Sequence, residues 1–172
     1  TGVDLVEANI AECLRGPTEA GLAFVQGDAE ALPLESQSAD VILSVESSHS
    51  YHSMPSFLLE IHRVLRPGGV FAFTDHRPMD EEWGERRTMA ALTKDLSESP
   101  LAIEKVWEIT DGVARCSEAI ADFKEEMLSA AHLSIADGAH LREILHCRGS
   151  NNFEKVRSGA WAYKCWHLRK GY

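Results

Sequence analysis

The sequence predicts a doubly wound α/β domain with a mostly parallel sheet, on three observations. Short β-rich apolar runs alternate with helical patterns through the first half of the chain. Residues 39–45 (ADVILSV) form a nearly continuous apolar run, which is typical of a strand buried on both faces of a parallel sheet. The length of 172 residues, 44% of them hydrophobic, is enough for one domain with a real core.

The first elements follow from apolar runs and their breakers. Residues 2–6 read as the end of a strand, and residues 7–15 as a helix that Gly16-Pro17 ends. A second strand is expected at 22–25, ending at Gly27-Asp28. The run 39–45 is the third strand.

The clearest helix lies between residues 53 and 66. Its apolar side chains recur on one face at 3.6-residue spacing, namely Phe57, Leu58, Ile61, Val64 and Leu65. Ser53 or Ser56 can cap its start, Pro55 fits the first turn, and the Pro-Gly-Gly at 67–69 ends it. A strand at 70–74 completes a βαβ unit, whose crossover is almost always right-handed.

The second half of the chain is more helical. Residues 80–98 are polar and helical in pattern, and residues 101–109 read as a strand. A long amphipathic helix is predicted over 110–132 and a shorter one over 138–147. The alternation at 160–168 predicts an edge or antiparallel strand.

The charge balance excludes several classes of partner. Lys and Arg number 17 against 27 Asp and Glu, so the net charge is −10. Binding to nucleic acid or to an anionic membrane is therefore not expected, whereas a cationic or neutral small ligand suits this field. The sequence contains no apolar run long enough to span a bilayer and no recognisable secretory signal, so we expect a soluble, cytoplasmic protein.

The cysteines do not indicate disulfides or zinc. The four lie far apart without a CxxC pair, at Cys13, Cys116, Cys147 and Cys165. The eight histidines do not flank them at ligand spacing, so buried free thiols and no metal site are the expectation.

Candidate ligand-binding residues follow the predicted strands. In open α/β sheets, ligands bind beyond the carboxyl ends of the strands. The residues there are Asp4, Asp28-Ala29, the run 46–51 and Asp75-His76. An acidic residue at such a position can accept hydrogen bonds from ribose hydroxyls or a base amino group. Each aspartate is equally well explained as a helix cap or a turn residue.

Four blocks of the sequence resemble class I S-adenosylmethionine-dependent methyltransferases of the type 11 group. They are TGVDL at 1–5, GDAEALP at 27–33, ADVI at 39–42 and EIHRVLRPGG at 60–69, in the order and spacing of that family. The segments ESSHSY at 46–51, EITDGV at 108–113 and SGAWAY at 158–163 are similar, less tightly, to small-molecule and lipid methyltransferases of the phthiotriolone dimycocerosate type.

The resemblance implies a Rossmann-like domain over residues 1–172. Residues 1–78 would form a partial cofactor-binding core and residues 79–159 a helical lid and substrate region around the strand at 101–109, before the final strand at 160–168. The cofactor would be S-adenosyl-L-methionine. No nucleic acid is expected as a partner, and a homodimer remains an open alternative.

The resemblance also assigns roles to individual residues. Asp4 would bind the ribose hydroxyls, with Leu5 packing on the adenine. Asp28 would face the adenine amino group, and the Ala29 amide would meet a ring nitrogen. Val45 and Glu46 would lie near the methionine part of the cofactor, and the acceptor would be bordered by His49, Tyr51, Asp75 and His76.

One part of the family pattern is absent from the sequence. The glycine-rich GxGxG loop, the strand before it and the helix after it are not present, and the Pro-Gly-Gly at 67–69 ends a helix instead of opening one. A fragment of a longer product, a record lacking its start and a degenerate pseudoenzyme are the three explanations. Because the missing strand is central in the family, we expect unpaired sheet edges and exposed apolar surface.

The function expected of the intact protein is methyl transfer to a small, largely apolar metabolite or lipid, most simply at oxygen. A hydroxyl acceptor benefits from a base, for which His49 is the first candidate, His76 the second and His52 the third. Carbon or nitrogen methylation stays open. So does a different class of function, in which an inactive remnant serves as an interaction module.

Overall fold

The computed structural model describes residues 1–16, 20–131 and 134–172. Strands and helices alternate in the first half of the chain, as predicted, and among these residues four helices separate the last two strands. In chain order the elements are β1 Gly2–Asp4, α1 Glu7–Cys13, β2 Phe24–Gln26, β3 Ala39–Val45, a 3-10 helix at Ser48–Ser50, α2 Met54–Val64, β4 Leu65–Pro78, a 3-10 helix at Glu85–Arg87, α3 Met89–Glu98, β5 Leu101–Glu108, α4 Thr110–Ala119, α5 Ala121–Ala130, α6 Ile135–Ile144, α7 Asn151–Arg157 and β6 Trp161–Lys170. None of the helices in these ranges has the length and apolarity needed to cross a membrane.

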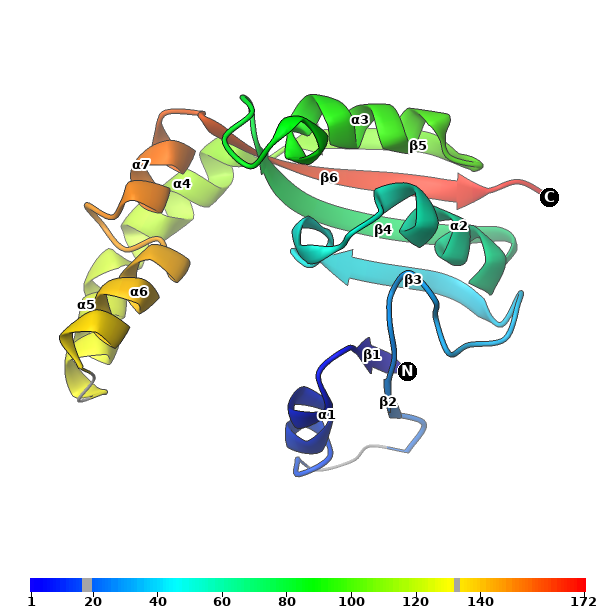
Figure 1. Cartoon of the computed structure of the whole chain (residues 1–172), viewed down its shortest axis with the longest axis horizontal. Coiled ribbons are helices and arrows are strands. Elements are labelled where there is room, and N and C mark those ends of the chain that lie inside the picture. Colours follow the sequence, from blue (N-terminus) through cyan, green and yellow to red (C-terminus); the bar gives the residue numbers. More distant parts are fainter. Residues whose placement is uncertain (17–19, 132–133) are drawn as a thin grey trace. The chain divides into compact units, whose positions relative to one another are not determined.

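The strands form two sheets within the described chain (Figure 1). β1 and β2 pair in parallel, with Val3 opposite Val25. The second sheet has the order β3-β4-β6-β5, and its β3 and β4 are also parallel, with Ile42 opposite Phe71. β3 and β4 are joined through α2, which is the predicted βαβ unit, so the α/β architecture is confirmed.

The described chain divides into two compact units. The first comprises residues 1–74, 92–106 and 166–172, and the second comprises residues 75–91 and 107–165. β4, β5 and β6 each contribute residues to both units.

The core of the first unit lies between α2 and the four-stranded sheet. The apolar face of α2 is buried as its periodicity predicts, at Phe57, Leu58, Ile61 and Val64. An aromatic row continues across the sheet: Phe57 meets Phe71 edge-on at 5.8 Å, Phe71 stacks on Phe73 at 5.3 Å, and Phe73 stacks on Trp166 at 5.2 Å. Ser53 caps α2 by accepting a hydrogen bond from the backbone N–H of Ser56 at 3.2 Å.

The second unit is built around the helices that lie between β5 and β6 in the sequence. Its buried apolar cluster consists of Val156, Trp161 and Tyr163, with Trp83 and Val113 packed against it. α5 is held to α6 by the Glu125–Arg142 ion pair, and Lys124 Nζ donates a hydrogen bond of 3.3 Å to the carbonyl of His146, just after α6.

Several boundaries differ from the prediction. The helix expected over 110–132 is two helices that meet at Ile120, whose φ of −104° and ψ of 13° are not helical. The apolar pattern runs on through this point, but the chain bends there and α5 packs against α6. Helix α7 was not predicted, and the polar stretch 80–98 is helical only from Met89 apart from one 3-10 turn. Pro17 and His132 lie outside the described residues.

The predicted helix 53–66 ends earlier, at Val64, because the extended strand β4 begins at Leu65. Lys170 Nζ donates hydrogen bonds of 2.8 Å to the carbonyls of His62 and Leu65, so a cation satisfies the carbonyl groups at the helix C-terminus. This contact joins positions more than a hundred residues apart, which no local pattern reveals.

The expectation that strand 39–45 is buried on both faces is wrong for the chain described. Val41, Leu43 and Val45 point to one face of β3 and are 64%, 69% and 56% exposed. β3 also ends the order of its sheet, so one of its edges has no partner strand among the described residues. The unpaired edge and exposed apolar surface that the missing pattern predicted are therefore confirmed.

Candidate functional site

The carboxyl ends of β1 and β2 lie side by side. The backbone N–H of Gly27 donates a hydrogen bond of 3.0 Å to the carbonyl of Asp4. Asp4, which accepts this bond, and Asp28, which follows Gly27, therefore lie next to each other, as expected for two parallel strands that end at the same edge. A common rim for these two carboxylates was the central geometric prediction of the sequence.

Both aspartates also make the local hydrogen bonds expected of cap and turn residues. Asp4 Oδ1 accepts from the backbone N–H of Val6 at 2.8 Å, and the Asn9 side chain donates to both of its oxygens at 3.1 Å. Asp28 Oδ1 accepts from the backbone N–H of Glu30 at 2.8 Å. A carboxylate has about four lone-pair sites, so these bonds orient each group and leave acceptor capacity for a ligand.

A cavity of about 1350 Å³ opens beside this rim. It is lined by the β1–β2 pair, the loop after β2 and the exposed face of β3. Residues singled out from the sequence as candidates for the site line it, namely Asp4, Leu5, Asp28, Ala29, Val45, Glu46, Tyr51 and His52. The cavity combines carboxylates at its rim with the apolar side chains of Val41, Leu43 and Val45.

The end of β3 has an unusual backbone. Glu46 follows β3 with a φ of +48°, in the left-handed region that disfavours residues with a Cβ. Its backbone N–H donates to the carbonyl of Thr74 at 2.9 Å, which ends the β3–β4 ladder. Just beyond, Tyr51 donates its hydroxyl to Ser47 Oγ at 3.0 Å and packs edge-on against Phe57 at 4.8 Å. Strained backbone of this kind concentrates at functional sites.

Gly27 is required by close packing. A Cβ at this position would lie 2.4 Å from Cδ of Pro33 and 3.2 Å from Cγ1 of Val3. Any side chain would therefore displace the loop that carries Asp28 and Ala29.

Two of the histidine candidates, His49 and His52, follow β3 and differ in whether they line the cavity. His49 is half-buried in the 3-10 helix Ser48–Ser50 and is not among the described residues that line the cavity. His52 lines the cavity, and its backbone N–H donates to Glu30 Oε1 at 2.7 Å.

Asp75 and His76 belong to the second unit and are buried there. Asp75 Oδ1 lies 3.6 Å from His76 Nδ1, and its other oxygen lies 3.1 Å from Arg77 Nη1. The imidazole of His76 stacks on Tyr163 at 4.8 Å, with Trp161 at 5.3 Å and Trp83 at 5.4 Å. His76 is therefore a packed member of an aromatic cluster, a surrounding that the sequence did not indicate.

His146 is a further member of that cluster. Its ring centroid lies 6.0 Å from Trp161 and 6.4 Å from both His76 and Tyr163. Burial, reinforced by the charge of Lys124 and opposed by that of Glu143, holds the pKa of His146 below its ordinary value. The backbone at His146 has a φ of +49°, in the position after α6 where glycine is common.

Comparison with known proteins agrees with the fold. Residues 1–73 match the methyltransferase domain family. The phthiotriol/phenolphthiotriol dimycocerosates methyltransferase of Mycobacterium tuberculosis is 35% identical over 99% of this chain and 60% of its own length. Residues 1–73 of this chain thus belong to the methyltransferase domain family.

Two further proteins show the extent of the likeness. The fatty-acid O-methyltransferase of Mycolicibacterium smegmatis is 46% identical over 62% of this chain and 39% of its own length. The geranyl diphosphate C-methyltransferase of Streptomyces coelicolor, solved with S-adenosyl-L-homocysteine, superimposes with a TM-score of 0.64 over 98% of this chain and 64% of that one, at 13% identity. This chain thus spans at most 60% of the curated relatives named here.

Proposed function

We propose that the protein to which this chain belongs transfers a methyl group from S-adenosyl-L-methionine to a small, largely apolar metabolite or lipid, at oxygen. The observation that carries the proposal is the common rim of Asp4 and Asp28 on one cavity. The names of the two relatives refer to phthiotriol dimycocerosates and to fatty acids, which are largely apolar molecules with oxygen-containing groups.

The residues present fit the nucleoside half of this cofactor. Asp4 offers carboxylate oxygens to ribose hydroxyls, Leu5 an apolar surface to the purine, and Asp28 an acceptor for the amino group. Leu5 is 64% exposed, so its side chain is available for such a contact. The backbone N–H of Ala29, on the cavity wall, suits a ring nitrogen.

Fewer residues of the chain are available to bind the methionine half of the cofactor. The sequence has no GxGxG loop, and Val45 and Glu46 are the cavity-lining residues proposed for that end. When bound, the cofactor supplies a methyl group made electrophilic by a positively charged sulfur. The carboxylates of Asp4, Asp28 and Glu46 give the cavity the sign of charge that attracts such a cation.

For the acceptor, the chain's own task is to hold it, exclude water and take up a proton. We propose His49 as the group that accepts the hydroxyl proton, with His76 as the second candidate and Tyr51 and Asp75 as bordering residues. A neutral imidazole close to physiological pH suits this task.

Calorimetry with S-adenosylhomocysteine tests the proposal. It is run on the chain as given and on an extended chimera, in which the residues that precede the matched region of the Mycobacterium tuberculosis relative are joined to Thr1. We expect the chimera to bind the ligand and the shorter chain to bind more weakly. Failure of both to bind contradicts the proposal.

Product analysis then identifies the acceptor atom. The chimera is incubated with cofactor and fatty acids or long-chain alcohols, and products are examined by mass spectrometry for methyl esters or ethers. Methylation of an amine or a carbon acceptor instead would assign the other reaction class.

A further inference from the structure

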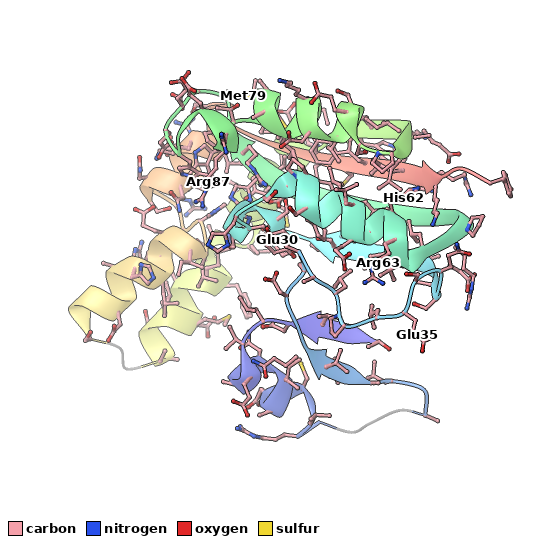
Figure 2. All side chains as sticks on the ribbon, turned by 45° about the vertical axis from the view of Figure 1, so that its right-hand side comes forward. Glu30, Glu35, His62, Arg63, Met79 and Arg87 are labelled. Carbon is pink, nitrogen blue, oxygen red and sulfur yellow. The ribbon has the colours of Figure 1, made fainter. Side chains whose placement is uncertain are left out.

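The loop that carries Asp28 and Ala29 is attached to α2 by side chains. Arg63 Nη2 donates to the carbonyl of Leu32 at 2.9 Å, and Nη1 donates to the carbonyl of Leu34 at 2.8 Å and to Ser36 Oγ at 3.3 Å. Figure 2 shows Arg63 on α2 beside the loop that runs between Glu30 and Glu35. One guanidinium therefore binds three alternate positions along the loop.

Glu60 fixes both the guanidinium and the loop. Arg63 Nε and Nη2 donate to its two carboxylate oxygens at 2.8 and 2.7 Å, which is the bidentate geometry of a strong ion pair. The backbone N–H of Leu32 donates to Glu60 Oε2 at 2.8 Å. The hydrogen bonds that Glu60 accepts from Arg63 and from the Leu32 N–H hold the pKa of its carboxyl below the ordinary value, although partial burial acts to raise it.

The ends of the same loop are bound to the same segment. Glu30 accepts a hydrogen bond from the backbone N–H of His52, just before α2, at 2.7 Å. Gln37 and Ser38 donate their backbone N–H groups to the carbonyls of Arg63 and Val64, both at 2.9 Å. The one β-type pairing that the described chain forms within the loop is an isolated bridge between Asp28 and Ala31. Its path therefore depends on α2 and not on regular secondary structure.

We propose that Arg63, together with Glu60, is a positioning residue for recognition of the nucleobase at Asp28 and Ala29. The inference rests on the proposed function and assigns a role to a residue outside the cavity lining. It also gives a physical link between two separate sequence blocks, 27–33 and 60–69. A carboxylate accepts from the amino group of adenine, whereas the carbonyl oxygen of hypoxanthine offers it no proton.

The test measures base discrimination, which general destabilisation would not change. Dissociation constants for S-adenosylhomocysteine and S-inosylhomocysteine are measured by calorimetry in the extended chimera, in wild type and in R63Q, R63K and E60Q. We expect wild type to prefer the adenosyl ligand, and R63Q to lose about tenfold of that preference. R63K should restore little of it, because an ammonium cannot reproduce the fork that reaches Leu32 and Leu34.

Arg66→Ala is the matched control. Arg66 lies just past the same helix and pairs at 2.7 Å with Asp40, an exposed residue of β3 and not of the loop. R66A should therefore keep the wild-type ratio. A wild-type ratio in R63Q, or in R63K and E60Q if R63Q does not fold, overturns the proposal.

Hydrogen exchange separates this proposal from the proposed function. The amides of residues 30–32 and 34–36 are followed in the 172-residue chain and should exchange faster in R63Q, with residues 57–61 unchanged. If wild-type chimera binds neither ligand, the proposed function fails. That result would also contradict the positioning role, because no base would be recognised. A wild-type ratio in the variants, by contrast, would contradict the positioning role alone.

Discussion

His76 stacks on Tyr163 with ring centroids 4.8 Å apart and ring planes inclined by 17°. The imidazole is 8% exposed and also contacts Trp161 and Trp83. Such packing suits a structural role, since aromatic pairs contribute about 0.5–1.5 kcal/mol beyond the area they bury. We propose that His49, which is only half-buried, is the better placed of the two to exchange protons.

The two histidines should therefore respond differently to replacement. In the extended chimera, His49→Gln should lower kcat by about a hundredfold with little effect on thermal stability, because it removes the proposed base. His76→Gln should lower the free energy of unfolding by about 1–2 kcal/mol through loss of the stack. Methyl-transfer kinetics and thermal unfolding, measured on both variants, check this. A larger kcat loss in His76→Gln at unchanged stability would reverse the assignment.

Stability should depend on pH through His146. Its pKa is lowered in the folded state, mainly by burial, so the unfolded chain binds the proton more readily. The contribution is complete above the ordinary histidine pKa and is lost as the pH falls toward the lower folded value. Urea unfolding of the chain should show that the free energy of unfolding decreases as the pH is lowered from about 7 to about 5.

His146→Asn provides the comparison for that titration. Asparagine tolerates the left-handed backbone at this position but does not titrate. The pH dependence between about pH 7 and pH 5 should be shallower in the variant. Equal slopes in variant and wild type would show that His146 does not contribute.

Replacing a rim aspartate should weaken cofactor binding. In the chimera, Asp28→Asn keeps the shape and the turn but replaces one acceptor oxygen by a donor amide, so the dissociation constant for S-adenosylhomocysteine should rise about tenfold. Asp40→Asn, which removes an exposed partner of Arg66, should leave it unchanged. Calorimetry measures both, and equal affinities would exclude Asp28 from the site.

The exposed face of β3 should promote self-association of the chain as given. Leu43 lies between Val41 and Val45 on the exposed face of β3, and one edge of this strand has no partner among the residues that the structure describes. Leu43→Lys should reduce the aggregate measured by light scattering, because a charge opposes edge pairing and apolar contact. Leu59→Lys, at a site on α2 that is 58% exposed, tests whether any added lysine has the same effect.

Local patterns in the sequence were sufficient for the βαβ unit and for the rim. β3 was predicted with its observed bounds, since its apolar run is continuous, and the capping serine of α2 was among two named. Asp4 and Asp28 could be placed together because parallel strands end at one edge. These inferences depend on neighbours in the chain or on a general rule of sheets.

Contacts between distant segments could not be predicted in this way. Three features depend on tertiary partners: the bend at Ile120, the end of α2 where Lys170 binds its last carbonyls, and the attachment of the 27–38 loop to Arg63. The surroundings of His76 were equally hidden, because Trp83, Tyr163 and His146 come from three separate segments.

The packing of Gly27 against Pro33 has a consequence for how such sequences diverge. With only 2.4 Å available to a Cβ, residue 27 cannot acquire a side chain unless the ring at 33 shrinks or withdraws. The two positions should therefore change in concert during evolution, and a chain that has lost the glycine should also have lost the proline.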